Sequence, residues 1–187
     1  MRWHRLPWAS VNSWIGAVGS IWSYGHRNPQ GFAFDPLTNK LWETEHGPTG
    51  GDELNLIEPG KNYGWAVVSY GMQAGITKSE QAGMESPKAY WTPTLAPGGI
   101  VFYNGNRYPG WKNSLFVSGL GGQQLRRLEI TKDTVTRQEG VFNEYCRVRD
   151  VIIGPDGYLY LTTSLPGQRV SDTTAGARIS ASAARRS

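Results

Sequence analysis

Runs of alternating apolar and polar residues, interrupted by turn signals, recur three times along the chain. The segments cover residues 31–47, 98–120 and 150–164, and each reads as an apolar run, a polar turn and a second apolar run. In the last of them, Pro155 fixes φ for a turn and Gly157 supplies positive φ. The pattern predicts three antiparallel hairpins.

Hairpins that recur every 50–70 residues or so are typical of a β-propeller, in which each repeat forms one four-stranded blade. Periodicity alone leaves a plain β-sandwich as the alternative. The polar stretches at 46–64 and 72–97 separate the hairpins. On a propeller such loops gather at one end of the central channel, where they can build a binding site.

The pattern divides the chain into three parts. Residues 21–164 are predicted to form an all-β, partial β-propeller. Residues 1–20 are Trp-rich without a strand or helix period, and they form an atypical leader. Residues 165–187 are rich in Ser, Ala and Arg, a composition that predicts a disordered tail.

Composition agrees with short strands and excludes several functions. The 187 residues contain 24 Gly, 8 Trp and 9 Tyr with only 18% charged residues, which favours tight turns over long helices. The net charge of +4 resides largely in the tail and indicates no nucleic-acid partner. No apolar run is long enough for a membrane span, and the first residues make no convincing signal peptide. The single Cys146 cannot form an internal disulfide.

The turn "GHRNPQG" at 25–31 concentrates directional polar groups. Arg27 offers a planar fork of donors that suits carboxylates or the edge of an ortho-quinone. Asn28 and Gln30 can donate and accept hydrogen bonds beside it. The alternative is a loop whose polar side chains only cap neighbouring backbone.

The Gly-rich loop that begins "EHGPTGGDE" at residue 45 is a candidate calcium site. Backbone carbonyls of Gly47 and Pro48, together with the carboxylates of Asp52 and Glu53, offer the oxygen ligands that Ca²⁺ prefers. The spacing is not that of an EF-hand, and no His/Cys spacing supports zinc. The alternative is that Asp52 and Glu53 face solvent.

Arg147 and Arg149 are two residues apart, which on a strand places both guanidinium groups on one face. Facing a channel, they would repel each other unless an anion lay between them. On an outer surface they would be ordinary solvated charges. No nucleophile–base arrangement is evident anywhere in the sequence.

Taken together and in order, these motifs resemble the soluble aldose sugar dehydrogenases that depend on pyrroloquinoline quinone (PQQ), the soluble glucose dehydrogenase family. The resemblance runs over about residues 21–163, through "IWSYGHRNPQG", "LWETEHGPTGGDELNLIEPGKNYGW", "TPTLAPGG" and "RVRDVIIGPDGYLYLTT". It implies roughly the last three blades of a six-bladed propeller. It also implies the oxidation of aldoses to lactones by hydride transfer to PQQ, with an external electron acceptor.

The resemblance also implies roles for particular residues. The groups that would contact PQQ are Arg27, Asn28, Gln30, Thr94, Arg147 and Arg149. The carbonyls of Gly47 and Pro48 would ligate the Ca²⁺ that activates PQQ. Glu53 and the carbonyl of Tyr63 would bind a second, structural Ca²⁺.

Some features depart from the family pattern. His46 stands where many glucose dehydrogenases have an amide, and a cofactor-contacting lysine is missing near Gly121 and Gly122. The family's base is a histidine upstream of "GHRNPQG", and residues 1–20 contain nothing like its surroundings. We therefore assign no catalytic residue and expect the chain to be inactive alone, as the product of a truncated or misread reading frame.

Two other functions are compatible with the sequence. One is a non-catalytic propeller that binds Ca²⁺ for stability only, and the other is a Ca²⁺-dependent lactonase, which ranks last because only Asp52 and Glu53 offer metal carboxylates. Full-length family members are expected to be periplasmic or secreted. The sequence fixes neither the sugar nor the oligomeric state.

Overall fold

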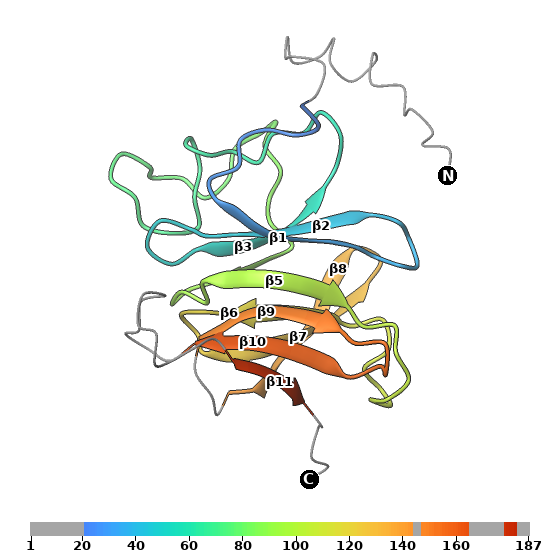
Figure 1. Ribbon diagram of the computed structural model, residues 1–187. Coiled ribbons are helices and arrows are strands. Elements are labelled where there is room, and N and C mark those ends of the chain that lie inside the picture. The colour runs from blue at the N-terminus through green and yellow to red at the C-terminus, as the bar shows by residue number, and fades with distance from the viewer. Residues whose placement is uncertain (1–20, 144–146, 165–177, 183–187) are drawn as a thin grey trace.

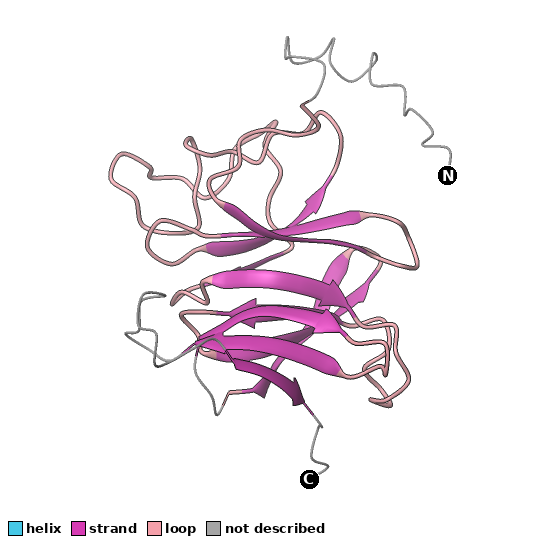
Figure 2. Cartoon of the chain, in the orientation of Figure 1, coloured by secondary structure: helices cyan, strands magenta, loops and turns pink. Residues whose placement is uncertain are grey.

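The structure is a computed structural model that describes residues 21–143, 147–164 and 178–182. These residues form three antiparallel sheets and no helix (Figure 2). The sheets have the orders β1-β2-β3-β4, β5-β6-β7-β8 and β9-β10-β11. Their strands are β1 Pro29–Phe34, β2 Leu41–Glu45, β3 Asp52–Ile57, β4 Ala89–Trp91, β5 Pro97–Phe102, β6 Leu115–Gly119, β7 Gln124–Thr131, β8 Thr134–Phe142, β9 Arg147–Ile153, β10 Leu159–Ser164 and β11 Arg178–Ser182.

The first strand of each sheet lies next to the first strand of the following sheet, so that β1, β5 and β9 run side by side through the middle of the molecule (Figure 1). Each sheet then continues away from these strands by antiparallel hairpins in chain order. This is the arrangement of consecutive propeller blades around an axis. The three strands begin at the same end, and the described loops before β1 and β5 meet there through His46 and Asp52.

Glycine makes this close approach possible. A Cβ built on Gly31 would lie 2.4 Å from the carbonyl oxygen of Gly98. One built on Gly98 would lie 2.2 Å from the carbonyl oxygen of Arg149, and one on Gly99 would lie 1.7 Å from Oδ1 of Asp150. Larger residues would therefore push the inner strands apart.

Apolar side chains fill the two spaces between successive sheets. One cluster joins the first sheet to the second and includes Trp42, Leu54, Phe102 and Leu115. The other joins the second sheet to the third; its buried members are Tyr103, Tyr108, Phe116, Leu125, Val148, Val151, Leu159 and Leu161. Face-to-face burial of this kind is the main favourable term that holds blades together.

The structure confirms the all-β prediction and all three hairpins, which appear as β1–β2, β5–β6 and β9–β10. A single two-layer sandwich was the wrong alternative, because the molecule has three sheets in succession. No helix of the described residues is long and apolar enough to cross a membrane.

The structure differs from the prediction of a disordered tail in one segment. Residues 178–182 were expected to be disordered but form β11, which pairs with β10. The edge of β10 presents unpaired backbone groups, and a segment of weak apolar pattern can satisfy them by backbone hydrogen bonds alone. The leader 1–20, Cys146 and the rest of the tail lie outside the described residues.

We predict that Gly98→Ala lowers the free energy of unfolding by about 2–3 kcal/mol, because the added methyl group would overlap backbone of β9. Urea denaturation followed by tryptophan fluorescence measures this loss. Gly140→Ala is the matched control in β8, since only the flexible side chain of Gln124 lies near its Cβ position. Equal stability of the two variants would contradict the tight contact between inner strands.

Candidate cofactor and cation site

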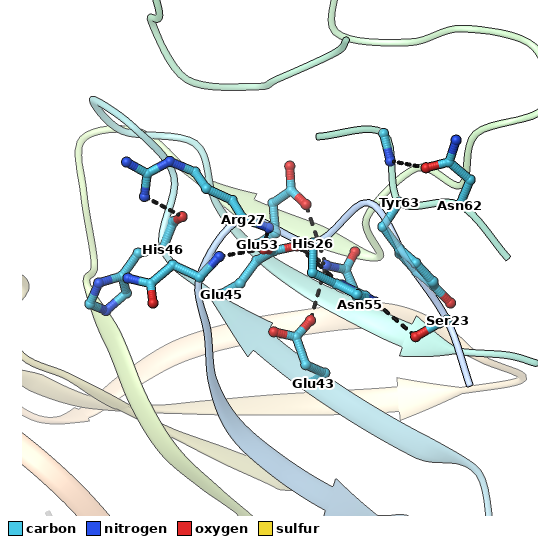
Figure 3. A network of polar contacts seen from close by, with 12 residues as sticks. Ser23, His26, Arg27, Glu43, Glu45, His46, Glu53, Asn55, Asn62 and Tyr63 are labelled. Atoms are coloured by element: carbon cyan, nitrogen blue, oxygen red, sulfur yellow. Dashed lines mark hydrogen bonds and ion pairs between the residues drawn. The ribbon is translucent and has the colours of Figure 1, made fainter. Parts of the chain in front are cut away.

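The turn that precedes β1 is held by a buried carboxylate. Glu45 Oε2 accepts hydrogen bonds from the backbone N–H groups of Arg27, at 2.5 Å, and Asn28, at 3.1 Å. Arg27 Nη1 donates to the carbonyl oxygen of His46 at 3.0 Å, and its guanidinium lies 5.1 Å from the ring centre of Trp65 (Figure 3). The orientation of Arg27 is therefore set by a carbonyl on one side and an indole ring on the other.

The Gly-rich loop between β2 and β3 is tied to the loop before β5 through Asp52. This side chain is only 1% exposed. Its carboxylate accepts hydrogen bonds from Gly47 N at 2.9 Å, Thr94 Oγ1 at 2.5 Å and Ala96 N at 2.7 Å. The alternative in which Asp52 faces solvent is thus wrong, and Asp52 instead brings Gly47 and Thr94 together.

A small cavity lies between this loop and the carboxylates of the first sheet. It has a volume of about 10 Å³, close to that of one water molecule or ion. Gly47, Pro48, Glu45 and Glu53 are among the residues that line it. Carboxylates beside a Gly-rich backbone form the hard oxygen environment that Ca²⁺ prefers, so the residues present fit a calcium ion.

Beneath this cavity, β2 and β3 place three carboxylates around one amide. The strand register pairs Glu43 with Asn55 and Glu45 with Glu53. Asn55 Nδ2 lies 3.2 Å from Glu43 Oε2, 3.1 Å from Glu45 Oε1 and 3.3 Å from Glu53 Oε2 (Figure 3). An amide carries two N–H hydrogens, so it cannot satisfy three carboxylates at once.

Burial and repulsion by neighbouring carboxylates disfavour ionisation of Glu43 and Glu53. Desolvation, followed by the charge of Glu45, raises the pKa of Glu43 to about 9. The same two causes raise the pKa of Glu53 to about 7. Among the described residues, no lysine or arginine forms an ion pair with any of the three carboxylates.

His26 completes the cluster from the turn before β1. Its Nε2 lies 2.8 Å from Ser23 Oγ, and its ring stacks on Tyr63 with 4.5 Å between ring centres. Its Nδ1 lies 3.7 Å from Glu45 Oε1 and has no hydrogen-bond partner. The Tyr63 hydroxyl donates to the carbonyl oxygen of Leu56, so the ring that positions His26 is itself fixed.

Arg147 and Arg149 flank the buried Val148 at the beginning of β9, on the opposite side of the strand. Nε of Arg147 is buried and has no hydrogen-bond partner, while Nε of Arg149 donates to Ser164 Oγ at 3.2 Å. The carbonyl oxygen of Arg149 accepts from Ser118 Oγ at 3.1 Å. The contact with Ser118 holds β9 against the second sheet, the contact with Ser164 joins β9 to β10, and Nε of Arg147 is left available for an anion.

An open cleft lies around Thr94. It has a volume of about 790 Å³, within the usual range of small-molecule sites. Its walls include Trp91, Gly121, Gly122 and Arg126. The cleft is large enough for a planar multi-ring cofactor, and the two glycines keep that wall free of side chains.

The structure thus brings most of the predicted residues to the end of the molecule where the inner strands begin. Arg27, Gly47 and Thr94 are linked through His46 and Asp52, and Arg147 and Arg149 begin the strand beside β5. Gln30 is exposed, and its amide donates to Asn28 Oδ1 at 2.9 Å and to the carbonyl oxygen of Pro29 at 3.1 Å.

Sequence reasoning missed Glu43, Glu45, Asn55 and His26. A signal was present, because "ETE" in one strand and "ELN" in the next place acidic and amide side chains two apart, on one face of each strand. That spacing was not interpreted as a buried face, since charged residues in a strand usually face solvent.

Comparison with known proteins identifies the family. The sequence profile described as Glucose / Sorbosone dehydrogenase matches residues 9–171. The chain belongs to the glucose/sorbosone dehydrogenase family. Within it, the chain is 42% identical over 155 residues to aldose sugar dehydrogenase YliI of Escherichia coli, covering 79% of this chain and 42% of that protein. An uncharacterized protein of Synechocystis is 45% identical over 152 residues, covering 79% of this chain and 37% of the relative.

Solved structures of the family have the same fold over part of their length. A structure named glucose dehydrogenase matches with a TM-score of 0.82 and 40% identity, covering 92% of this chain and 48% of that one. The PQQ-bound aldose sugar dehydrogenase of Streptomyces coelicolor matches with a TM-score of 0.64 and 32% identity, covering 85% of this chain and 44% of that one. The chain therefore spans about half of these propeller dehydrogenases, which confirms the prediction of a partial propeller.

The carboxylate cluster predicts a pH dependence of stability in buffer that contains a chelator. The folded-state pKa values of Glu43 and Glu53 lie above the ordinary 4.5, so the folded chain binds more protons than the unfolded chain above that pH. Stability is therefore expected to fall as the pH rises from about 4.5 to about 9. Measurement of the melting temperature across this pH range tests the expected fall in stability.

The matched pair of variants is Glu43→Gln and Glu58→Gln. Glu43 is buried, whereas Glu58 is exposed on the loop after β3. Glu43→Gln should flatten the decline in stability, and Glu58→Gln should leave it unchanged. A wild-type chain whose stability rises between pH 6 and pH 9 would contradict the raised pKa values.

Proposed function

We propose that this chain forms the cofactor-holding part of a PQQ- and Ca²⁺-dependent aldose dehydrogenase, which oxidises sugars to lactones. The observation that carries the proposal is that the guanidinium of Arg27, the Asp52-bound Thr94 and the two arginines of β9 all lie near the end of the molecule where the inner strands begin. Membership of the glucose/sorbosone dehydrogenase family supports it.

The arginines suit the carboxylates of the quinone. Nε of Arg27 and Nε of Arg147 are buried without hydrogen-bond partners. A buried donor without a partner costs free energy, which a bound carboxylate would recover through a charge-assisted hydrogen bond. Thr94 faces the adjoining cleft, and Asn28 and Gln30 are exposed beside Arg27, where they could extend the same contact surface.

Calcium is proposed to bind in two places beside this site. The carbonyls of Gly47 and Pro48 would hold one ion against the quinone, where its charge polarises the reacting carbonyl. Glu53, on the cavity wall, would hold the structural ion together with the carbonyl of Tyr63. Consecutive positive φ angles at Gly50 and Gly51, 67° and 68°, curl the loop around the first of these places.

PQQ supplies the redox chemistry when it is bound, and the sugar hydroxyl must lose a proton in the same step. Of the two histidines of the described residues, His46 is engaged at Nε2, and the Nδ1 of His26, which has no partner, is buried beside Glu45. His46 Nε2 donates to the carbonyl oxygen of Pro97 at 2.8 Å, and His26 lies against Ser23 and Tyr63. We therefore propose that the base lies outside the described residues and that the chain alone holds the cofactor without turning over sugar.

Titration with PQQ in the presence of Ca²⁺ tests the proposal, with tryptophan fluorescence or calorimetry as the measurement. Arg147→Ala combined with Arg149→Ala should weaken PQQ binding at least tenfold, because two cationic partners of its carboxylates are lost. Arg137→Ala is the control, since this arginine is 61% exposed on the outer strand β8. Equal PQQ affinity in the double variant and the wild-type chain would contradict the assignment.

The same titration distinguishes a non-catalytic, calcium-stabilised binding module. Such a module would show a higher melting temperature with Ca²⁺ and no further change with PQQ. A quinone-binding chain would show both increases, because any ligand that binds only the folded state stabilises it.

A further inference from the structure

We propose that His26, Glu43 and Glu45 form a buried site for one divalent transition-metal ion of the Mn²⁺ or Zn²⁺ class. This site is separate from the two calcium positions proposed above. One ligand atom from each of the three side chains lies within 4.8 Å of the others. Glu43 and Glu53 lie on opposite sides of Asn55 (Figure 3), and Glu43 is not among the residues that line the small cavity.

The first observation is that two buried polar atoms of the proposed site have no hydrogen-bond partner. Glu43 is fully buried, and its Oε1 has no hydrogen-bond partner. The buried Nδ1 of His26 also has none. Native structures rarely leave such groups unsatisfied, and a cation bound between them would satisfy both.

The geometry around His26 matches that of a ligand. If Nε2–H donates to Ser23 Oγ, 2.8 Å away, Nδ1 is left with its lone pair toward the carboxylates. Metal-ligating histidines are usually fixed by such a donation from the other ring nitrogen. The 3.7 Å between Nδ1 and Glu45 Oε1 is too long for a hydrogen bond. It agrees with two atoms that each lie about 2.1 Å from one ion.

The ligand types select the class of metal. One imidazole nitrogen and two carboxylates are typical ligands of Mn²⁺, Fe²⁺ and Zn²⁺, whereas Ca²⁺ prefers oxygen ligands only. Asn55 lies beside the site, and its buried Oδ1 has no partner. A turn of its amide would offer this oxygen as a further ligand once a cation removes the need for N–H donors.

Metal binding here would act on the cofactor turn. Glu45 faces the proposed ion with Oε1, and its Oε2 accepts from the backbone of Arg27 and Asn28. An ion that fixes Glu45 and His26 therefore fixes the backbone on either side of Arg27.

Titration of the chelator-treated chain with Co²⁺ tests the proposal, with the visible absorption of the bound ion as the readout. Excess Ca²⁺ and no PQQ are present, so that oxygen-only sites are filled and quinone binding plays no part. We expect one equivalent of Co²⁺ to bind. A hundredfold excess over Kd should raise the melting temperature by about 5–10 °C.

Glu43→Gln and His26→Gln should each weaken Co²⁺ binding at least tenfold, whereas Glu58→Gln should bind like the wild-type chain. Glu43→Gln places a neutral amide of the same size at this buried position, so the metal-free variant should fold and melt no lower than the wild type at pH 8, as circular dichroism can check. The proposal is overturned if no absorption band appears, if excess Ca²⁺ abolishes it, or if His26→Gln leaves it unchanged.

Discussion

The close approach of the inner strands is the constraint on which the rest of this structure depends. Gly31, Gly98 and Gly99 let β1, β5 and β9 lie against one another with backbone facing backbone. The apolar clusters between the sheets then hold the blades at that spacing. Because the inner strands begin at one end, the turn before β1, the loop between β2 and β3 and the loop before β5 lie close together there, and the candidate site is made largely of these segments.

That crowding also explains why acidic side chains are buried beside the site. β2 follows β1 directly, and its residues Trp42 to Glu45 are all covered on both faces. Glu45 serves the turn before β1, and Asp52 serves the loop before β5. Each carboxylate replaces water as the acceptor for backbone N–H groups that the loops cannot pair among themselves. The polar groups at the centre thus provide the scaffold for the arginines.

The sequence was sufficient for the three hairpins β1–β2, β5–β6 and β9–β10, but not for the other strands or for the interior of the candidate site. Alternation and turn residues such as Pro155 and Gly157 are local signals, and the hairpins that they predict are present. The roles of Asp52 and Asn55 depend on partners forty residues away or on a neighbouring strand, which periodicity cannot report. β11 was not predicted for a related reason. Its sequence lacks a strong strand pattern, and it forms because the edge of β10 is available for pairing.

The amide of Asn55 has a consequence for how this centre responds to a ligand. Two hydrogens shared among three carboxylates allow several hydrogen-bond arrangements of similar energy. The side chains of this cluster can therefore exchange between several hydrogen-bond arrangements, even though the surrounding interior is closely packed. Anything that neutralises one of the three oxygens would select a single arrangement, so the centre can become more ordered with little movement of the backbone.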